Sequence, residues 1–91
     1  MTADTVVKML KKIASQYESY AYAFDHGGIK QAARHMYSTG VAYQKAVEAM
    51  HMDIDTWTTD ERRDVLRAWD RAVTEKIDCD RAWKRQGFRT T

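Results

Sequence analysis

Histidine and aspartate come close together in one stretch of the sequence, which makes it the first place to look for metal chemistry. His51, Asp53 and Asp55 alternate with other residues, and imidazole and carboxylate groups are common metal ligands. Zinc sites usually have paired ligands at fixed spacing, such as two cysteines separated by two residues or two histidines on one helical face. The sequence has neither pattern, and His26 and His51 are predicted near helix ends, where an imidazole interacts favourably with free carbonyl groups. We therefore expect no bound metal or other cofactor.

The single cysteine, Cys79, is the other residue that could do covalent chemistry. A catalytic cysteine needs a nearby base to remove its proton, but only Lys76 is close in the sequence, and the fold would have to bring His35 from far away. A buried structural thiol explains a lone cysteine more simply. Nucleophile elbows and phosphate-binding glycine loops are also absent from the sequence. We therefore predict a protein with no catalytic residues.

Arginines recur every four residues at Arg63, Arg67 and Arg71, so they form a row along one face of a helix. Arg81 and Arg85 extend this row in angle. Such a row can follow the phosphates of a nucleic acid, but acidic residues on the same face cancel much of its field. These acidic residues are Asp60, Asp64, Asp70 and Asp78. We therefore expect mainly a solvated surface of ion pairs.

The short basic tail, residues 87–91, is a better candidate for nucleic-acid binding. Trp83 and Phe88 could stack on bases while Arg85 and Arg89 contact phosphates. The chain as a whole carries a formal net charge of only +2, which is modest for a nucleic-acid-binding protein. A small helical nucleic-acid-binding regulator that uses the arginine row and the tail is therefore the alternative function.

Two charged residues interrupt the apolar stripe predicted for the third helix. Lys76 and Asp80 fall at angles close to those of Trp69, Val73 and Ile77. Charged groups at such positions must pair, lose their charge or stay in contact with water. Either this half of the helix extends beyond the core and leaves both residues solvated, or they pair with each other or with a polar group of the other helices, as a polar element of an interface.

Aromatic residues are the most suggestive feature of the composition. They make up 11% of the chain, more than three short helices can easily bury. Tyr22 and Tyr37 lie off the predicted apolar seams, and Tyr, Trp and Arg are the residue types enriched at the centres of protein interfaces. The predicted partner-binding surface comprises Tyr22, Tyr37, Arg63, Arg67, Arg71, Trp83 and Arg85.

The helices that carry these residues are marked by the spacing of apolar side chains. Apolar residues alternate in steps of four and three on both sides of Gly27-Gly28, where the chain turns. The first seam comprises Val6, Leu10, Ile13, Tyr17, Tyr20 and Phe24, and the second comprises Ile29, Ala33, Met36, Gly40, Tyr43, Val47 and Met50. This spacing predicts an antiparallel helical hairpin over residues 3–25 and 29–50. Gly40 lies on the seam, which favours close packing over a kink as its explanation.

A third helix is predicted over residues 59–86, after a linker or short helical turn at residues 51–56. Thr58 and Glu61 match the capping box that begins a helix, and Gly87 supplies the stop. The predicted apolar face comprises Val65, Leu66, Trp69, Ala72, Val73, Ile77 and Trp83. Their spacing is nearer to 3.6 than to 3.5 residues, so we expect this helix to cross the hairpin rather than run along it.

The sequence therefore predicts one all-α domain over residues 1–91, in which a third long helix packs on a helical hairpin. No apolar run approaches the roughly 20 residues that span a bilayer, and a lone cysteine needs no oxidising compartment, so we expect a cytoplasmic protein that binds no membrane. A core this small would gain from pairing with a second copy, which weakly favours a homodimeric bundle. We expect a non-enzymatic protein–protein interaction module, such as an adaptor, regulator or inhibitor, that covers a surface of its partner. Its small size resembles that of the accessory proteins of phages and mobile elements.

Overall fold

The computed structural model describes residues 1–87 and confirms the predicted all-α, three-helix architecture for them. The helices are α1 (Ala3–Asp25), α2 (Ile29–Asp53) and α3 (Thr59–Gly87), and a short 3₁₀ helix, η1 (Ile54–Thr56), connects α2 to α3. Helix α2 therefore continues to Asp53 rather than ending at residue 50. Residues 88–91, which hold most of the predicted basic tail, lie outside the described residues.

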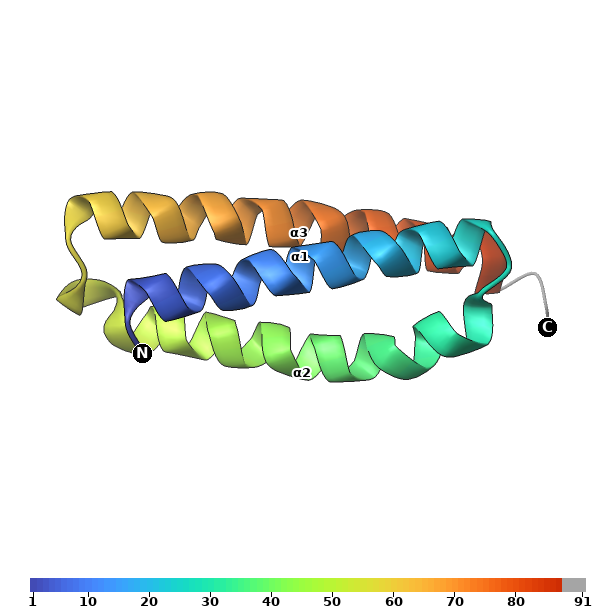
Figure 1. Ribbon diagram of the computed structural model, residues 1–91, viewed down its shortest axis with the longest axis horizontal. Coiled ribbons are helices and arrows are strands. Elements are labelled where there is room, and N and C mark those ends of the chain that lie inside the picture. The colour runs from blue at the N-terminus through green and yellow to red at the C-terminus, as the bar shows by residue number, and fades with distance from the viewer. Residues whose placement is uncertain (88–91) are drawn as a thin grey trace.

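Helix α1 is the central element of the bundle, because α2 and α3 both pack on it and have little contact with each other (Figure 1). The molecule measures 47 × 18 × 15 Å. A helix of 29 residues, such as α3, is about 43 Å long at 1.5 Å per residue, so it extends along the long axis of the molecule. The prediction that the third helix crosses the hairpin was wrong: α3 runs alongside α1 and in the same direction.

The reason lies in the small residues of α3. Its buried residues are Val65, Ala68, Ala72, Cys79 and Ala82, which recur in steps of three, four, seven and three. This is a heptad spacing, which keeps a helix alongside its neighbour. The large side chains of the contact come from α1, where Leu10, Ile13 and Tyr17 are at most 2% exposed. Small residues on one helix allow it to approach the large residues of the other closely.

Leu66 and Ile77 were predicted to belong to the apolar face of the third helix that packs on the hairpin, and the structure contradicts this. They remain 49% and 46% exposed. The heptad of small residues turns a different side of α3 toward α1, so these two large apolar residues lie on its flank. The apolar surface of α3 is therefore wider than the contact with α1.

The predicted helix signals are present at their expected positions. Thr58 Oγ1 accepts a hydrogen bond from the amide of Glu61 (3.2 Å), and Glu61 Oε1 accepts one from the amide of Thr58 (2.9 Å). Gly27 has a φ of +91° in the turn after α1, a conformation that favours glycine. Gly40 differs from the prediction, because a Cβ at this position would meet only Tyr17 Oη, at 3.8 Å. The contact leaves room for a methyl group, so close packing does not account for this glycine.

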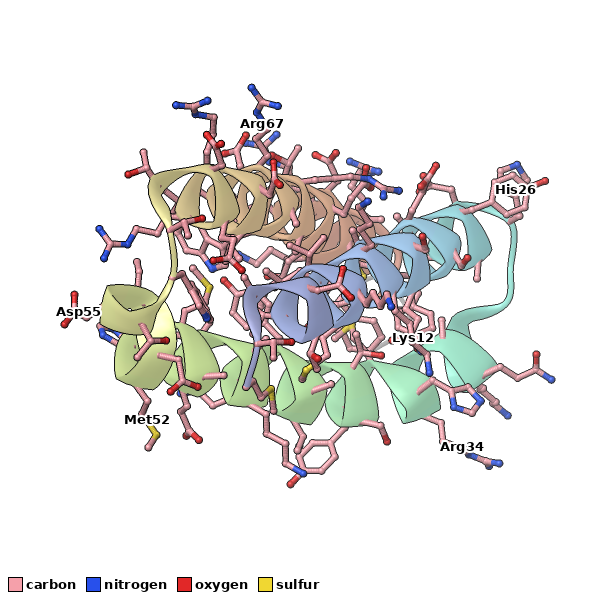
Figure 2. All side chains as sticks on the ribbon, turned by 60° about the vertical axis from the view of Figure 1, so that its left-hand side comes forward. Lys12, His26, Arg34, Met52, Asp55 and Arg67 are labelled. Atoms are coloured by element: carbon pink, nitrogen blue, oxygen red, sulfur yellow. The ribbon has the colours of Figure 1, made fainter. Side chains whose placement is uncertain are left out.

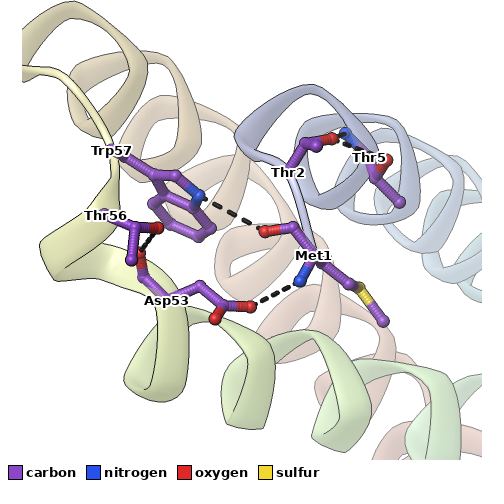
Figure 3. A network of polar contacts seen from close by, with 6 residues as sticks. All are labelled: Met1, Thr2, Thr5, Asp53, Thr56 and Trp57. Atoms are coloured by element: carbon purple, nitrogen blue, oxygen red, sulfur yellow. Dashed lines mark hydrogen bonds and ion pairs between the residues drawn. The ribbon is translucent and has the colours of Figure 1, made fainter.

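The end of the bundle near η1 is held by polar contacts between distant parts of the chain (Figure 3). The Met1 amino group lies 2.6 Å from Asp53 Oδ2 at the end of α2. The buried side chain of Trp57 donates a hydrogen bond from Nε1 to the Met1 carbonyl oxygen at 3.4 Å. Thr56 Oγ1 donates to the Asp53 carbonyl oxygen at 2.6 Å. These contacts fix the α2–η1 junction against the start of α1.

Candidate protein-interaction surface

Helices α2 and α3 have little contact with each other, and we call the boundary between them the α2–α3 seam. Its residues are Met36, Val47, Met50 and His51 of α2, Ile54 of η1, and Trp69 and Cys79 of α3. Cys79 Sγ lies 3.7 Å from Met36 Sδ. Met50, Ile54 and Trp69 stay half-buried, whereas Cys79 is fully buried toward α1. The seam therefore leaves apolar surface of two long helices incompletely covered.

An apolar pocket lies within the seam. Val47, Met50, His51, Ile54 and Trp69 line a volume of about 160 Å³, which is the size of one large apolar side chain. The Trp69 Nε1 atom is buried and has no hydrogen-bond partner among the described residues. A buried donor without an acceptor is destabilising. The seam therefore contains an unsatisfied hydrogen-bond donor.

Exposed apolar residues lie on the flank of α3, next to the seam residue Trp69. Leu66 precedes Trp69 by three residues and Val73 by seven, and Ile77 follows Val73 by four, so these side chains form one stripe on the helix. Trp69 and Val73 are half-buried, and Leu66 and Ile77 are exposed. On the other side of the seam, Val47 and Met50 of α2 are half-buried. An incoming apolar surface could therefore contact both helices.

Lys76 and Asp80 pair with each other on α3, which was one of the two expectations for them. Lys76 Nζ lies 3.2 Å from Asp80 Oδ2, and both side chains remain partly exposed. Burial raises the pKa of Tyr17 to about 12, and the Asp80 carboxylate adds to this shift. Burial raises the pKa of Cys79 to about 11, again with a contribution from Asp80. Both groups therefore keep their protons at neutral pH.

The two tyrosines of the predicted partner surface are exposed. Tyr22 is 66% exposed at the end of α1, where its ring stacks on His26 with the ring centres 3.9 Å apart. The His26 Nδ1 atom lies 2.8 Å from the Tyr22 carbonyl oxygen, so this imidazole forms a hydrogen bond with a carbonyl group at the helix end. Tyr37 is 79% exposed on α2. The other large aromatic residues are buried or half-buried within the described residues.

The predicted arginine row is largely engaged in ion pairs. Arg63 pairs with Asp60 at 3.5 Å, Arg71 with Glu18 of α1 at 3.4 Å, and Arg85 with Asp25 of α1 at 3.3 Å. Arg67 has no carboxylate within ion-pair distance among residues 1–87 and points away from the bundle (Figure 2). Only the pair of Arg63 with Asp60 uses an acidic residue expected on that face, and the other two pairs connect α3 to α1.

Arg67 and Arg71 line a groove of about 670 Å³ between α1 and α3, which we call the α1–α3 groove. Acidic and basic side chains alternate around it. Its charged residues are Asp4, Lys11, Glu61, Asp64, Arg67 and Arg71. Burial and the neighbouring Glu18 and Asp78 carboxylates raise the pKa of Glu75. A groove with this mixture of charges has little net field to attract a polyanion.

Trp83, the remaining residue of the predicted surface, contributes to the core. It is half-buried, and its ring centre lies 5.3 Å from that of Phe24, a typical distance for a stabilising aromatic pair. None of the seven predicted residues lines the pocket of the α2–α3 seam. Sequence reasoning missed the exposure of Leu66 and Ile77, and the heptad of small residues in α3 was the signal that could have revealed it.

The described residues contain no cluster of three or more histidine, cysteine or carboxylate side chains that could hold a metal ion. None of the helices in residues 1–87 combines the length and apolar character needed to cross a membrane. No protein-family model matches the chain, and no curated protein or solved structure matches it either. Functional inference therefore depends on the surfaces of the molecule itself.

Proposed function

We propose that this protein is a non-enzymatic interaction module that binds an amphipathic helix of another protein in the α2–α3 seam. The observation that carries the proposal is the incomplete coverage of the seam. Leu66 and Ile77 are about half exposed beside half-buried Trp69, although the same helix packs tightly on α1. Apolar stripes of this kind on a small protein are typical of protein interfaces.

The shape of the seam favours a helix as the partner. Two long antiparallel helices border it, and an added helix between them would complete a four-helix arrangement. The pocket of about 160 Å³ beside Trp69 can accept one bulky apolar side chain of that helix. A central tryptophan next to such a pocket is typical of residues that dominate binding energy. Bound in this way, the protein would cover its partner's helix and block other uses of it.

Two further observations support a function without catalysis. Cys79 is fully buried, and burial raises its pKa to about 11, whereas a nucleophilic cysteine needs a lowered pKa and access to substrate. The ion pairs of Arg63, Arg71 and Arg85 leave few free cations on that face of α3. This makes nucleic-acid binding through the arginine row the less favoured function.

Site-specific photo-crosslinking in cells that naturally produce the protein would test the proposal. A photoreactive amino acid at Leu66 should give adducts with one specific protein, and the same amino acid at Thr74, an exposed site elsewhere on α3, should not. Purified partner should then bind Ile77→Glu at least tenfold more weakly than wild type, because a charge would enter an apolar contact. Ser15→Glu, at an exposed position of α1, is the control and should bind like wild type.

Three results would contradict the proposal. Equal crosslinking from Thr74 and Leu66 would show that the partner does not bind preferentially at the seam. Adducts of Leu66 with a second copy of this chain, together with dimers in light scattering, would assign the seam to the homodimer that the sequence weakly favours. Gel-shift binding of DNA or RNA that Arg67→Ala abolishes and Ile77→Glu does not would favour the nucleic-acid function.

A further inference from the structure

A second opening, between α1 and α2, differs from the α2–α3 seam in its chemistry. We call it the α1–α2 cleft; it has a volume of about 310 Å³. Its lining residues are Met9, Lys12, Ile13, Gln16 and Tyr20 of α1 and His35, Ser38, Thr39 and Ala42 of α2. Five of these nine carry a hydroxyl, amide or imidazole group and one carries an ammonium group, but none is a carboxylate. The α1–α3 groove, by contrast, is lined by Asp4, Glu61 and Asp64.

Thr39 forms the floor of the polar part of the cleft. It is 3% exposed and is the only buried polar residue in the described part of the chain. Its hydroxyl proton lies toward two acceptors, the His35 carbonyl oxygen at 3.2 Å and Gln16 Oε1 at 3.3 Å. Tyr20 Oη lies 2.8 Å from Thr39 Oγ1, and either hydroxyl can be the donor in this contact.

The hydrogen bonds around Thr39 occupy acceptor atoms, whereas donor groups of the cleft remain available to a ligand. Gln16 directs its amide oxygen toward Thr39, so both N–H bonds of its amide group are available to the cleft. Ser38 contributes a hydroxyl group and His35 an imidazole. Lys12, labelled in Figure 2, contributes an ammonium group. No carboxylate among residues 1–87 lies within ion-pair distance of Lys12, whereas Lys8, one turn earlier, pairs with Asp4 at 3.1 Å.

A cleft with several donors, an unpaired ammonium group and no carboxylate is complementary to an oxyanion. Its donors outnumber what one carboxylate can accept, and a phosphate has three strong acceptor oxygens and a charge near −2. Met9, Ile13 and Ala42 form an apolar part of the lining, which suits an organic group attached to the phosphate. We propose that the α1–α2 cleft binds a small phosphate monoester, with its oxygens at Lys12, Gln16 and Ser38 and its organic group against Met9 and Ala42.

Phenyl phosphate is a suitable probe, and NMR titration of the ¹⁵N-labelled full chain is the measurement. We expect saturable shifts confined to the Gln16 side-chain amide and the backbone amides around Lys12 and residues 35–42, with a dissociation constant of about 1 mM or below for so small a ligand. Lys12→Gln should weaken binding about tenfold. Lys11→Gln is the matched control, because it makes the same charge change in the neighbouring residue, which lines the α1–α3 groove. Its affinity should equal that of wild type.

Three further measurements complete the test. Ser38→Ala should weaken binding about threefold, and circular dichroism should show that each variant keeps its helices. Inorganic phosphate should bind more weakly than phenyl phosphate, and phenylacetate at least tenfold more weakly. Equal losses in Lys11→Gln and Lys12→Gln, equal affinities for phenylacetate and phenyl phosphate, or the absence of shifts at 10 mM probe would each overturn the proposal. None of these outcomes depends on the partner that binds the α2–α3 seam.

Discussion

Helix α1 makes two contacts of opposite character, one with α3 and one with α2. The contact with α3 sets large α1 side chains against alanines and Cys79, several of them fully buried. The contact with α2 includes alanines as well, but a hydroxyl network around Thr39 and the α1–α2 cleft lie within it. Small residues in a heptad allow close approach over the whole length of a helix, whereas polar groups that must keep their hydrogen bonds leave room between helices.

This difference explains where the candidate sites lie. Close packing of α3 on α1 fixes the position of α3, and α2 is then held mainly by α1 and by the junction at η1. Both sites proposed above, the α2–α3 seam and the α1–α2 cleft, border α2, whereas the α1–α3 groove carries a mixture of charges.

Enlarging one alanine in each contact should show the largest difference between them. Ala72→Leu places three extra carbon atoms in the α1–α3 contact, where Ala72 is 0% exposed, and should destabilise the protein by about 3 kcal/mol. Ala42→Leu adds the same atoms beside the α1–α2 cleft and should change stability by less than about 1 kcal/mol. Urea denaturation followed by circular dichroism measures both. Similar losses in the two variants would mean that both contacts are equally tight.

The stability of the protein at alkaline pH should show how well the centre of the bundle excludes water from the Tyr17 hydroxyl. Tyr17 has a raised pKa, so the unfolded chain releases this proton near pH 10 and the folded chain near pH 12, and stability falls as pH rises through that range. A shift from 10 to about 12 corresponds to about 3 kcal/mol, of which about 2 kcal/mol is lost by pH 12. The free energy of unfolding of Tyr17→Phe should therefore rise by about 2 kcal/mol relative to that of wild type between pH 8 and pH 12. A constant difference between the two proteins across this range would show that the Tyr17 hydroxyl is hydrated.

Gly40→Ala should give the smallest effect and the opposite sign. The new methyl group would lie 3.8 Å from Tyr17 Oη, an ordinary contact distance, so the helix preference of alanine should stabilise the protein by about 1 kcal/mol. A rise in the urea midpoint without a change in slope would confirm it. Destabilisation would show that α1 and α2 approach more closely at this level than the cleft suggests.

The fold was largely predictable because it follows from local signals. The heptad spacing around Leu10, the turn at Gly27 and the capping box at Thr58 each act within a few residues, and the helices begin and end close to the predicted positions. The direction of α3 was not predicted, because its true contact residues are alanines and Cys79, which carry little weight in a search for large apolar residues. The same error placed Leu66 and Ile77 in the core.

The candidate sites were predictable only in part. Exposure of Tyr22 and Tyr37 followed from their positions off the apolar seams. The α1–α2 cleft did not, because Gln16 and Thr39 are 23 residues apart and neither belongs to a recognisable motif. Ion pairs such as Arg71 with Glu18 likewise join residues that meet only after folding.

The amino-acid sequence alone determined that the chain forms three amphipathic helices, where each begins, and that a hairpin joins the first two. These properties depend on side-chain periodicity and on caps, which operate over one or two turns. The packed bundle decided which side of α3 is buried, which arginines are paired and which helix pairs remain apart. Those outcomes depend on the fit between side chains distant in sequence, because a small residue allows close approach only where a large one stands opposite.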